Sequence, residues 1–324
     1  MTVAGTAPDV LDLITDEEPL DGHDGRSGAR IARARLEGLA VVVKRVSRDD
    51  PMLELTGDDV GRELALWSSG ALDKVGNPVG HAIIAGGIVG NEYVTVMRDL
   101  GATVVGWRRL MPPSQVLQLV RSVSAVHRQF VAAVPAVTCS LERRLTLFAA
   151  HRAREAVGSP LSDSIRRGWE RFDELVDDDI RSAVERVHRD PAVLAASLRR
   201  DGTTLLHGDL WVTNLAIVDG RTVLLDWGLA TDGPPVLDFV IFLTGCASQI
   251  QIGADDFVDL VRRAGVTQDA AVFNAAFGWG IAELGWNKAL DATEHPDPDH
   301  RDRERDALLW WCARARAALD AGLL

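Results

Sequence analysis

One segment, LLHGDLWVTNLAIVDGRTVLLDWG (residues 205–228), constrains the structure of this chain more than any other. It contains two short runs of aliphatic and β-branched residues, LAIV and RTVLL, on either side of Asp219-Gly220. Asp-Gly between two such runs is a strong signal for a two-residue β-hairpin turn. The hairpin would bring Asn214 and Asp226 together at its open end. Since strand residues alternate between faces, we expect one of these two side chains to lie beyond the regular ladder or at a bulge.

Together with Asp209, these residues form the set of side chains that a kinase-type active site requires. One carboxylate accepts the proton of an attacking hydroxyl, while an amide and a second carboxylate hold the magnesium that bridges the ATP phosphates. Taken singly, each of these residues would more often be structural, and the alternative is a surface hairpin with polar ends. The intact spacing favours the catalytic interpretation.

The run H-G-D-L-W-V-T-N followed by L-L-D-W-G resembles the catalytic and metal-binding loops of the aminoglycoside phosphotransferase and choline kinase family, which shares its fold with protein kinases. The resemblance implies that Asp209 is the catalytic base and that Asn214 and Asp226 ligate magnesium. It also implies that His207 is a scaffold for the loop and that Asp238 braces it. A carboxylate in an apolar segment such as P-P-V-L-D-F has to be paired.

The resemblance and the local patterns together predict an α+β, bilobal, protein-kinase-like fold. Residues 1–100 would form a small β-rich N-lobe, with 1–23 as a helical or loosely ordered lead-in, and residues 101–324 a larger, mainly helical C-lobe. The N-lobe patterns predict strands over 29–36, 39–46, 81–89 and 92–97 and a helix over 58–72. The C-lobe patterns predict helices over 114–131, 141–157, 165–176, 180–199, 239–250, 255–264, 270–290 and 303–321, with a polar, proline-broken loop over 291–299.

Lys44 and Glu63 are the candidates for gripping the nucleotide. Lys44 lies inside the apolar strand VVVKRV. A compact ammonium on a flexible stem suits the α- and β-phosphates of ATP, where a guanidinium fork is not equivalent. Glu63, in the predicted helix that comes next in the chain, is the natural ion-pair partner. Taken alone, Lys44 would be a gatekeeper on an edge strand and Glu63 an ordinary solvated helix residue.

Two less specific patterns complete the predicted nucleotide site. D-G-R-S-G-A, which contains Ser27 and Gly28, resembles the family's phosphate-covering loop without a full G-x-G-x-x-G, and a plain turn is the alternative. M-R-D-L-G contains Met97 and Asp99. Its place in the order of elements corresponds to the hinge segment that holds adenine through backbone hydrogen bonds. The sequence does not distinguish ATP from GTP.

The segment after the hairpin favours a small-molecule kinase over a protein kinase. From Gly228 the chain runs through LATDGPPVLDFVIFL into a predicted helix, without a long Ser/Thr-bearing activation segment and without A-P-E. The residue immediately before Asp209 also favours a small-molecule kinase. Protein kinases commonly place an arginine before the catalytic aspartate, and Gly208 occupies that position here.

The composition bears on partners and location. Asp and Glu number 47 against 35 Lys and Arg, which disfavours nucleic acid or an anionic membrane as partner and mildly favours a cationic substrate. The three cysteines are far apart and form neither a metal motif nor a disulfide framework, so a reducing cytoplasm is expected. No apolar run reaches bilayer length, and the N-terminal segment lacks the h-region of a signal peptide. A monomer is the default expectation.

The molecule that accepts the phosphoryl group, here called the acceptor, is the least constrained part of the prediction. Acidic residues of the helical lobe, including Asp232 and Glu283, can bind ammonium groups. Trp279 and Trp286 lie on one side of a predicted helix with Glu283 between them, which suits a wall for a cation, although a core-facing stripe is more common. The acceptor would be an aminoglycoside or a metabolic alcohol such as an amino alcohol, sugar or hydroxy amino acid. A kinase-like nucleotide-binding module without turnover is the alternative of a different class.

Overall fold

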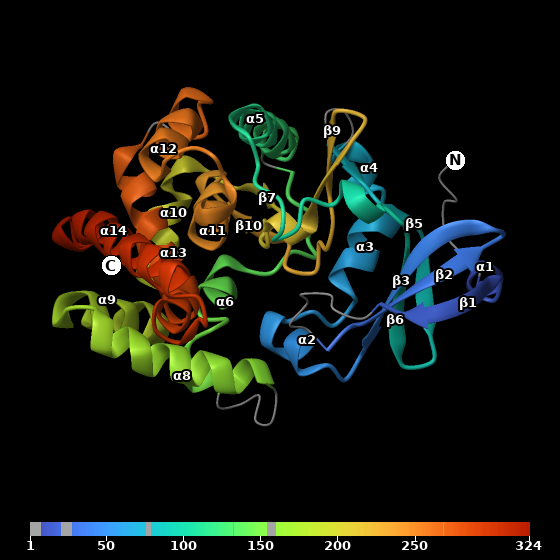
Figure 1. Ribbon diagram of the computed structural model, residues 1–324, viewed down its shortest axis with the longest axis horizontal. Helices are drawn as coiled ribbons and strands as arrows, with labels where there is room; N and C mark the ends of the chain where they lie inside the picture. The colour runs from blue at the N-terminus through green and yellow to red at the C-terminus, as the bar shows by residue number, and fades with distance from the viewer. Residues whose placement is uncertain (1–7, 21–27, 76–78, 132, 154–159, 268) are drawn as a thin grey trace.

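The computed structural model describes residues 8–20, 28–75, 79–131, 133–153, 160–267 and 269–324. Its N-terminal part is an antiparallel five-stranded sheet, at the right in Figure 1, with strand order β1-β2-β3-β6-β5. The predicted strands of this region correspond to β2, β3, β5 and β6, so that part of the prediction is confirmed. The five strands are β1 Ile14–Pro19, β2 Arg30–Leu36, β3 Leu39–Ser47, β5 Ile83–Val89 and β6 Glu92–Arg98.

Strand β1 is an edge strand that the sequence pattern does not reveal. Its residues, ITDEEP, are exposed at all but the first position, and its pairing with β2 shifts register between Thr15 and Glu18. A polar and irregular edge strand lacks the alternation from which strands are predicted. Because β1 pairs with β2, the glycine-rich segment that contains Ser27 and Gly28 connects two neighbouring strands.

The helix predicted over 58–72 is wrong in its bounds, because glycines interrupt it. Gly61 precedes α3 with a φ of 70°, and Gly70 separates α3 from α4 with a φ of 72°. A positive φ is incompatible with a right-handed helix and costs glycine least. Asp58 lies outside the helix and accepts hydrogen bonds from the amide of Arg62 at 2.7 and 2.8 Å. The helices of this region are α1 Pro8–Leu11, α2 Pro51–Thr56, α3 Arg62–Ser68 and α4 Ala71–Val75.

The predicted hairpin is present as β8 Leu215–Val218 and β9 Arg221–Leu224. Asp219 and Gly220 both have positive φ, of 48° and 73°, as the tight turn requires. The hairpin belongs to a three-stranded sheet, because β4 Val79–His81 pairs with β9 in parallel. Strand β4, which comes from the N-terminal part of the chain, therefore adds to the sheet that carries the proposed catalytic loop.

The C-terminal part is mainly helical, at the left in Figure 1. Three predicted elements have wrong boundaries. The helix predicted over 141–157 is interrupted after Leu145, which separates α6 from α7. The helix predicted over 180–199 is divided by Pro191 into α9 and α10, and the loop predicted over 291–299 is mostly helix. α13 continues to Glu294 and α14 begins at Pro298, capped by the Asp297 carboxylate. The helices are α5 Pro113–Gln129, α6 Leu141–Leu145, α7 Ala150–Ala153, α8 Pro160–Leu175, α9 Asp178–Arg189, α10 Ala192–Leu198, α11 Val236–Cys246, α12 Ala254–Arg263, α13 Ala270–Glu294 and α14 Pro298–Asp320.

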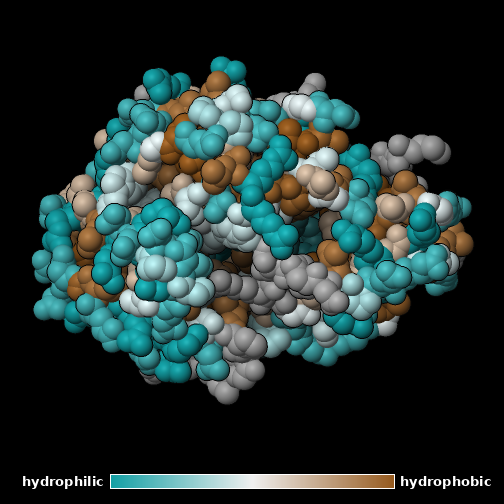
Figure 2. All heavy atoms as spheres, in the orientation of Figure 1, coloured by the Kyte–Doolittle hydropathy of each residue, from teal (hydrophilic) through white to brown (hydrophobic). Residues whose placement is uncertain are grey.

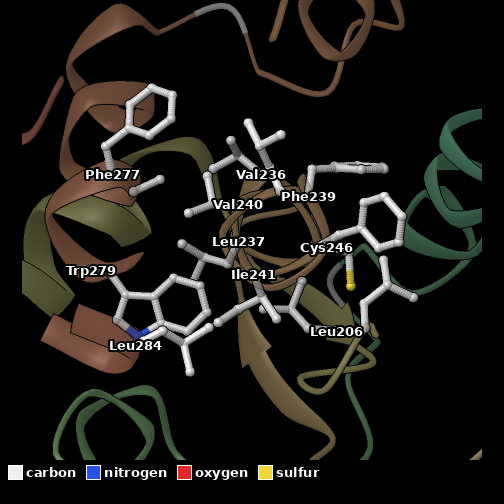
Figure 3. Close-up of a cluster of buried hydrophobic side chains, with 14 of the residues drawn as sticks. Leu206, Val236, Leu237, Phe239, Val240, Ile241, Cys246, Phe277, Trp279 and Leu284 are labelled. Atoms are coloured by element: carbon white, nitrogen blue, oxygen red, sulfur yellow. The ribbon is translucent and has the colours of Figure 1, made fainter. Parts of the chain in front are cut away.

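The C-lobe core is built around α11 and α13, both buried on nearly all sides. Figure 3 shows Trp279 and Leu284 of α13 turned towards Leu237 and Ile241 of α11. Trp279 is only 2% exposed, so it belongs to this core. For Trp279, the core-facing alternative is therefore correct, and not the cation-binding wall. On the face shown in Figure 2, hydrophilic residues cover much of the helical lobe. No described helix is long and apolar enough to cross a membrane.

Candidate active site

The turn that carries Asp209 requires a glycine at position 208. The segment follows β7 Thr204–Leu206, which pairs with β10 Thr231–Gly233. Gly208 has a φ of 78°, and a Cβ on it would lie 2.0 Å from the carbonyl oxygen of Leu229. A side chain is therefore excluded by both backbone conformation and close approach. This turn places Asp209 on the wall of a cavity that Lys44 of the N-lobe also lines.

Asp238, in the first helical turn of α11, fixes the backbone before Asp209 by hydrogen bonds. Its carboxylate accepts hydrogen bonds of 2.9 Å from the amides of His207 and Gly208 and from Nε2 of His127. Burial alone would raise the pKa of Asp238, but the hydrogen bond and charge of His127 hold the pKa below its usual value. The His207 ring in turn lies 2.9 Å from the carbonyl oxygen of Leu225, which links the turn to the end of the hairpin.

Asn214 and Asp226 both lie just outside the regular ladder of the hairpin. Asn214 ends the 3-10 turn Val212–Asn214 immediately before β8. Asp226 follows β9 and has a φ of 59°, in the left-handed region. The sequence-based expectation of a departure from strict alternation is therefore confirmed. A non-glycine residue held at such a φ is a strained position of the kind that clusters at functional sites.

Asp209 and Asn214 are in direct contact. The Asn214 amide nitrogen donates to the carbonyl oxygen and to Oδ2 of Asp209, both at 2.9 Å. This turns the amide oxygen of Asn214 away from Asp209. Burial, reinforced by the negative charge of Asp226, raises the pKa of the Asp209 carboxyl. A raised pKa makes this carboxylate a better proton acceptor than an ordinary aspartate.

Lys44 joins the sheet to the hairpin. Its ammonium lies 3.0 Å from Oε2 of Glu63 on α3 and 2.8 Å from Oδ1 of Asp226. Burial alone would lower the pKa of Lys44, but these two carboxylates raise it. Burial alone would likewise raise the pKa of Asp226, and Lys44 holds it below its usual value. The pair Lys44–Asp226 is therefore charged on both sides, so the ammonium suits an anionic phosphate and the carboxylate suits a divalent cation.

One cavity of about 710 Å³ is lined by Lys44, Asp209, Asn214 and Asp226. It extends from β3 and α3 of the N-lobe to α11, α13 and α14 of the C-lobe. The four polar residues that the sequence analysis placed in one site thus meet on one surface. Glu283 and Trp286, proposed as substrate residues, line the same cavity.

A sequence model of the phosphotransferase enzyme family, APH, matches residues 84–285, which is well over half of the chain. The chain belongs to this phosphotransferase family. The family predicted from the catalytic motif is therefore confirmed. No curated protein sequence matches the chain.

Solved structures with the same bilobal, kinase-like fold include choline kinase LicA from Streptococcus pneumoniae, with a TM-score of 0.54 and 11% identity over 94% of this chain and 95% of that one. An aminoglycoside-3'-phosphotransferase of type VIII has a TM-score of 0.53 and 21% identity over 83% of this chain and 93% of that one. At these identities the likeness shows the fold alone, and the predicted fold class is confirmed.

The oxygen atoms around Asp226 fit a magnesium ion in this phosphotransferase. No group of three His, Cys, Asp or Glu side chains suited to a metal occurs in the described part of the chain. Magnesium commonly binds through one or two carboxylates plus substrate phosphates and water, so such a group is not required. Lys44 and the Gly228 amide contact Oδ1 of Asp226, so Oδ2 of Asp226 and the amide oxygen of Asn214 are the atoms that could hold the ion.

Several predicted residues lie elsewhere. The described residues that line the cavity do not include Met97, Asp99 or Asp232. Met97 packs beside the core, and Asp99 accepts a hydrogen bond from Arg33 at 3.2 Å and one from the Gly101 amide at 2.9 Å. Asp232 lies 3.5 Å from Arg199, so its proposed substrate role is not supported by its position.

Of the two residues proposed for the phosphate-covering loop, the structure describes one. Ser27 lies outside the described residues. Gly28 is described, and a Cβ on it would lie 2.5 Å from Oδ2 of Asp50, which itself lines the cavity. Gly28 therefore lies beside a residue of the cavity wall, at a position where only glycine fits without displacement of Asp50.

Two buried arginines that the sequence analysis did not single out support the site. Arg62 is 1% exposed and donates to the carbonyl oxygens of Gly228, Val137 and Thr56 at 2.6, 2.8 and 3.0 Å. Arg144 is 2% exposed and donates to the Gly208 carbonyl at 2.6 Å while pairing with Glu283. Arginines in amphipathic helices usually face solvent, so no local pattern marks these two as buried.

Proposed function

We propose that the chain transfers the γ-phosphoryl group of ATP to a hydroxyl group of a small molecule. The observation that carries this proposal is the meeting of Lys44, Asp209, Asn214 and Asp226 on the wall of one cavity. These are the residue types that a kinase needs for nucleotide grip, proton acceptance and metal binding. Membership of the phosphotransferase family supports the same reaction class.

Asp209 is the proposed base. Its carboxylate would accept the acceptor's hydroxyl proton as the new oxygen–phosphorus bond forms and the bond from the γ-phosphorus to the bridging oxygen of ADP breaks. Asn214 occupies Oδ2 of Asp209, so the remaining oxygen is the proposed proton acceptor. The raised pKa of Asp209 supports this role.

Lys44 is the proposed ligand of the nucleotide phosphates, held in place by Glu63. Asn214 and Asp226 would hold magnesium, which when bound neutralises charge on the β- and γ-phosphates. These residues act by binding and orienting, so most of the rate enhancement would come from positioning and electrostatics.

A small-molecule acceptor is supported by the segment after the hairpin. From Gly228 the chain passes through the short strand β10 directly into α11 at Val236. The chain therefore has little room there for a long activation loop, and the helical lobe supplies the rest of the cavity wall.

The test is a screen of the purified protein with ATP and magnesium against aminoglycosides, amino alcohols, sugars and nucleosides. We expect ATP consumption that depends on one acceptor class and phosphorylation of that acceptor, detected by mass spectrometry. Asp209→Asn should lower turnover on the order of 10²–10⁴-fold while nucleotide binding is kept. Undiminished turnover by this variant would refute the assignment of the base. ATP binding without any acceptor-dependent turnover would favour the binding module instead.

A further inference from the structure

The cavity that Asp209 lines is also lined by two pairs of aromatic side chains. The rings of Trp107 and Trp211 have centroids 5.8 Å apart and meet edge to face at 69°. The rings of Phe148 and Trp286 are also 5.8 Å apart, at 57°. All four line the same cavity as Asp209. An acceptor that places its hydroxyl near Asp209 would therefore lie among these rings.

Trp211 is fixed against the catalytic turn. It follows Asp209 by two residues, and its ring covers Gly245 of α11, where a Cβ would lie 2.4 Å from the indole. The missing side chain at Gly245 thus makes space for this ring. Trp107, 36% exposed, lies at the open side of the pair.

Phe148 and Trp286 are held equally firmly. The carbonyl oxygen of Phe148 accepts a hydrogen bond of 2.7 Å from the Trp169 indole. Trp286 is 2% exposed, and Gly168 of α8 packs against its backbone so closely that a Cβ would lie 2.3 Å from the carbonyl oxygen. Rigid aromatic side chains lose little entropy on binding and supply a large apolar contact area.

Apart from Asp209 and Asp226, several charged side chains of the C-lobe wall are paired with one another. The helical C-lobe contributes the carboxylates Glu283, Asp291 and Glu304 and the cations Arg144 and Lys288. Two of the carboxylates are used in buried ion pairs, Glu283 with Arg144 and Glu304 with Lys288. Drawing such a carboxylate away from its partner would leave a buried charge uncompensated, which is costly.

Two further groups contribute to the polarity of the wall. His295 and His300 stack with centroids 3.9 Å apart and also line the cavity. Burial lowers the pKa of His300, which favours its neutral form. Oε2 of Glu283 is buried without a hydrogen-bond partner among the described residues, so it can accept one donor from a ligand.

We propose that the acceptor is an alcohol with a hydrophobic ring and no more than one positive charge, and that Trp107, Trp211, Phe148 and Trp286 bind that ring. This inference rests on the proposed phosphotransferase function. The aromatic wall suits one donor directed at Glu283 and disfavours a polycation, whose charges would face Glu283 and Glu304, which are already paired.

The test compares 4-nitrophenyl β-D-glucoside, glucose and kanamycin as acceptors, with calorimetric binding of each in the presence of a non-hydrolysable ATP analogue. These probes separate a hydrophobic ring from a bare sugar and from a polycationic sugar. We expect the aryl glucoside to bind and react at least tenfold better than the other two. Trp211→Ala should raise its KM about tenfold and leave the KM of ATP unchanged. Leu309→Ala, at a residue that is 52% exposed and outside the cavity, is the matched control and should change neither constant.

The outcomes separate this inference from the proposed function. Preferred phosphorylation of kanamycin or glucose would overturn the inference and leave the phosphotransferase proposal standing. Absence of any phosphorylation, together with tight and Trp211-dependent binding of the aryl glucoside, would support the inference about the pocket and refute the proposed reaction. Equal binding of the three probes would overturn the inference whether or not they react.

Discussion

The guanidinium of Arg62 donates to the carbonyl oxygen of Gly228 at 2.6 Å, across 166 positions of sequence. Its neighbour Glu63 accepts a hydrogen bond from the Trp227 amide at 3.1 Å. Two consecutive residues of α3 thus hold the two residues that come after Asp226. Because Asp226 has a left-handed backbone conformation, these contacts explain how its carboxylate is kept next to Lys44.

Arg62→Lys should therefore weaken magnesium-dependent activity. A lysine keeps the charge but cannot reach three carbonyl groups at once, since it lacks the planar fork of arginine. We expect the magnesium concentration for half-maximal rate to rise severalfold, with kcat reduced about tenfold. Initial rates measured across a magnesium titration test this.

Arg143→Lys is the control for Arg62→Lys. Arg143 also links the lobes, by donating to the Glu54 carbonyl oxygen at 3.0 Å, but it is exposed and does not contact the loop after Asp226. Its substitution should leave the magnesium dependence unchanged. A similar change in both variants would indicate that lobe contact in general, and not the position of Asp226, is responsible.

The pH dependence of turnover should report Asp209. A base has to be deprotonated, and burial raises the pKa of Asp209, so activity should fall as the pH decreases through a value above the ordinary aspartate pKa of about 3.9. The logarithm of kcat/KM should lose one unit per pH unit on this limb. A limb centred at or below the ordinary value would argue that Asp209 is not the base.

Asp238→Asn should destabilise the protein most strongly near neutral pH. The folded-state pKa of Asp238 lies below its unfolded value, so its contribution is fully present above the unfolded value and is lost as the pH falls through the folded value. Breaking its buried pair with His127 is expected to cost about 3–5 kcal/mol. In urea unfolding, the difference from wild type should be largest at pH 7 and should shrink as the pH is lowered below 4.

Gly208→Ala should abolish activity and lower the free energy of unfolding by several kcal/mol. The added Cβ would overlap the Leu229 carbonyl oxygen, and the φ of 78° is unfavourable for alanine. Gly265→Ala, just after α12, is the matched control, since Gly265 has a φ of 71° with nothing within 4 Å of the added Cβ. Urea unfolding should show a cost of about 1–2 kcal/mol for the control from backbone strain alone. Equal costs for both would argue against the close contact at Gly208.

The sequence predicts the local parts of the candidate site because short-range patterns encode them. The Asp219-Gly220 turn, the flanking strands and the spacing of Asp209, Asn214 and Asp226 all lie within one segment. Lys44 is conspicuous because a lysine rarely occurs inside an apolar strand. Boundaries are harder, and the split of the predicted helix over 58–72 depends on glycines that take up positive φ only in the folded chain.

By itself, then, the sequence determined the order of strands and helices and the polar residues of the hairpin, through turn chemistry and hydrophobic periodicity, and the resemblance of its catalytic motif implied the kinase-like fold. Tertiary structure alone decided that Arg62 is buried and that Asp232 and Met97 lie off the cavity. It also decided that Glu283 is paired and that four aromatic rings line the pocket. Burial and pairing depend on backbone and side-chain atoms contributed by segments far apart in the chain, and no local pattern records which of them meet.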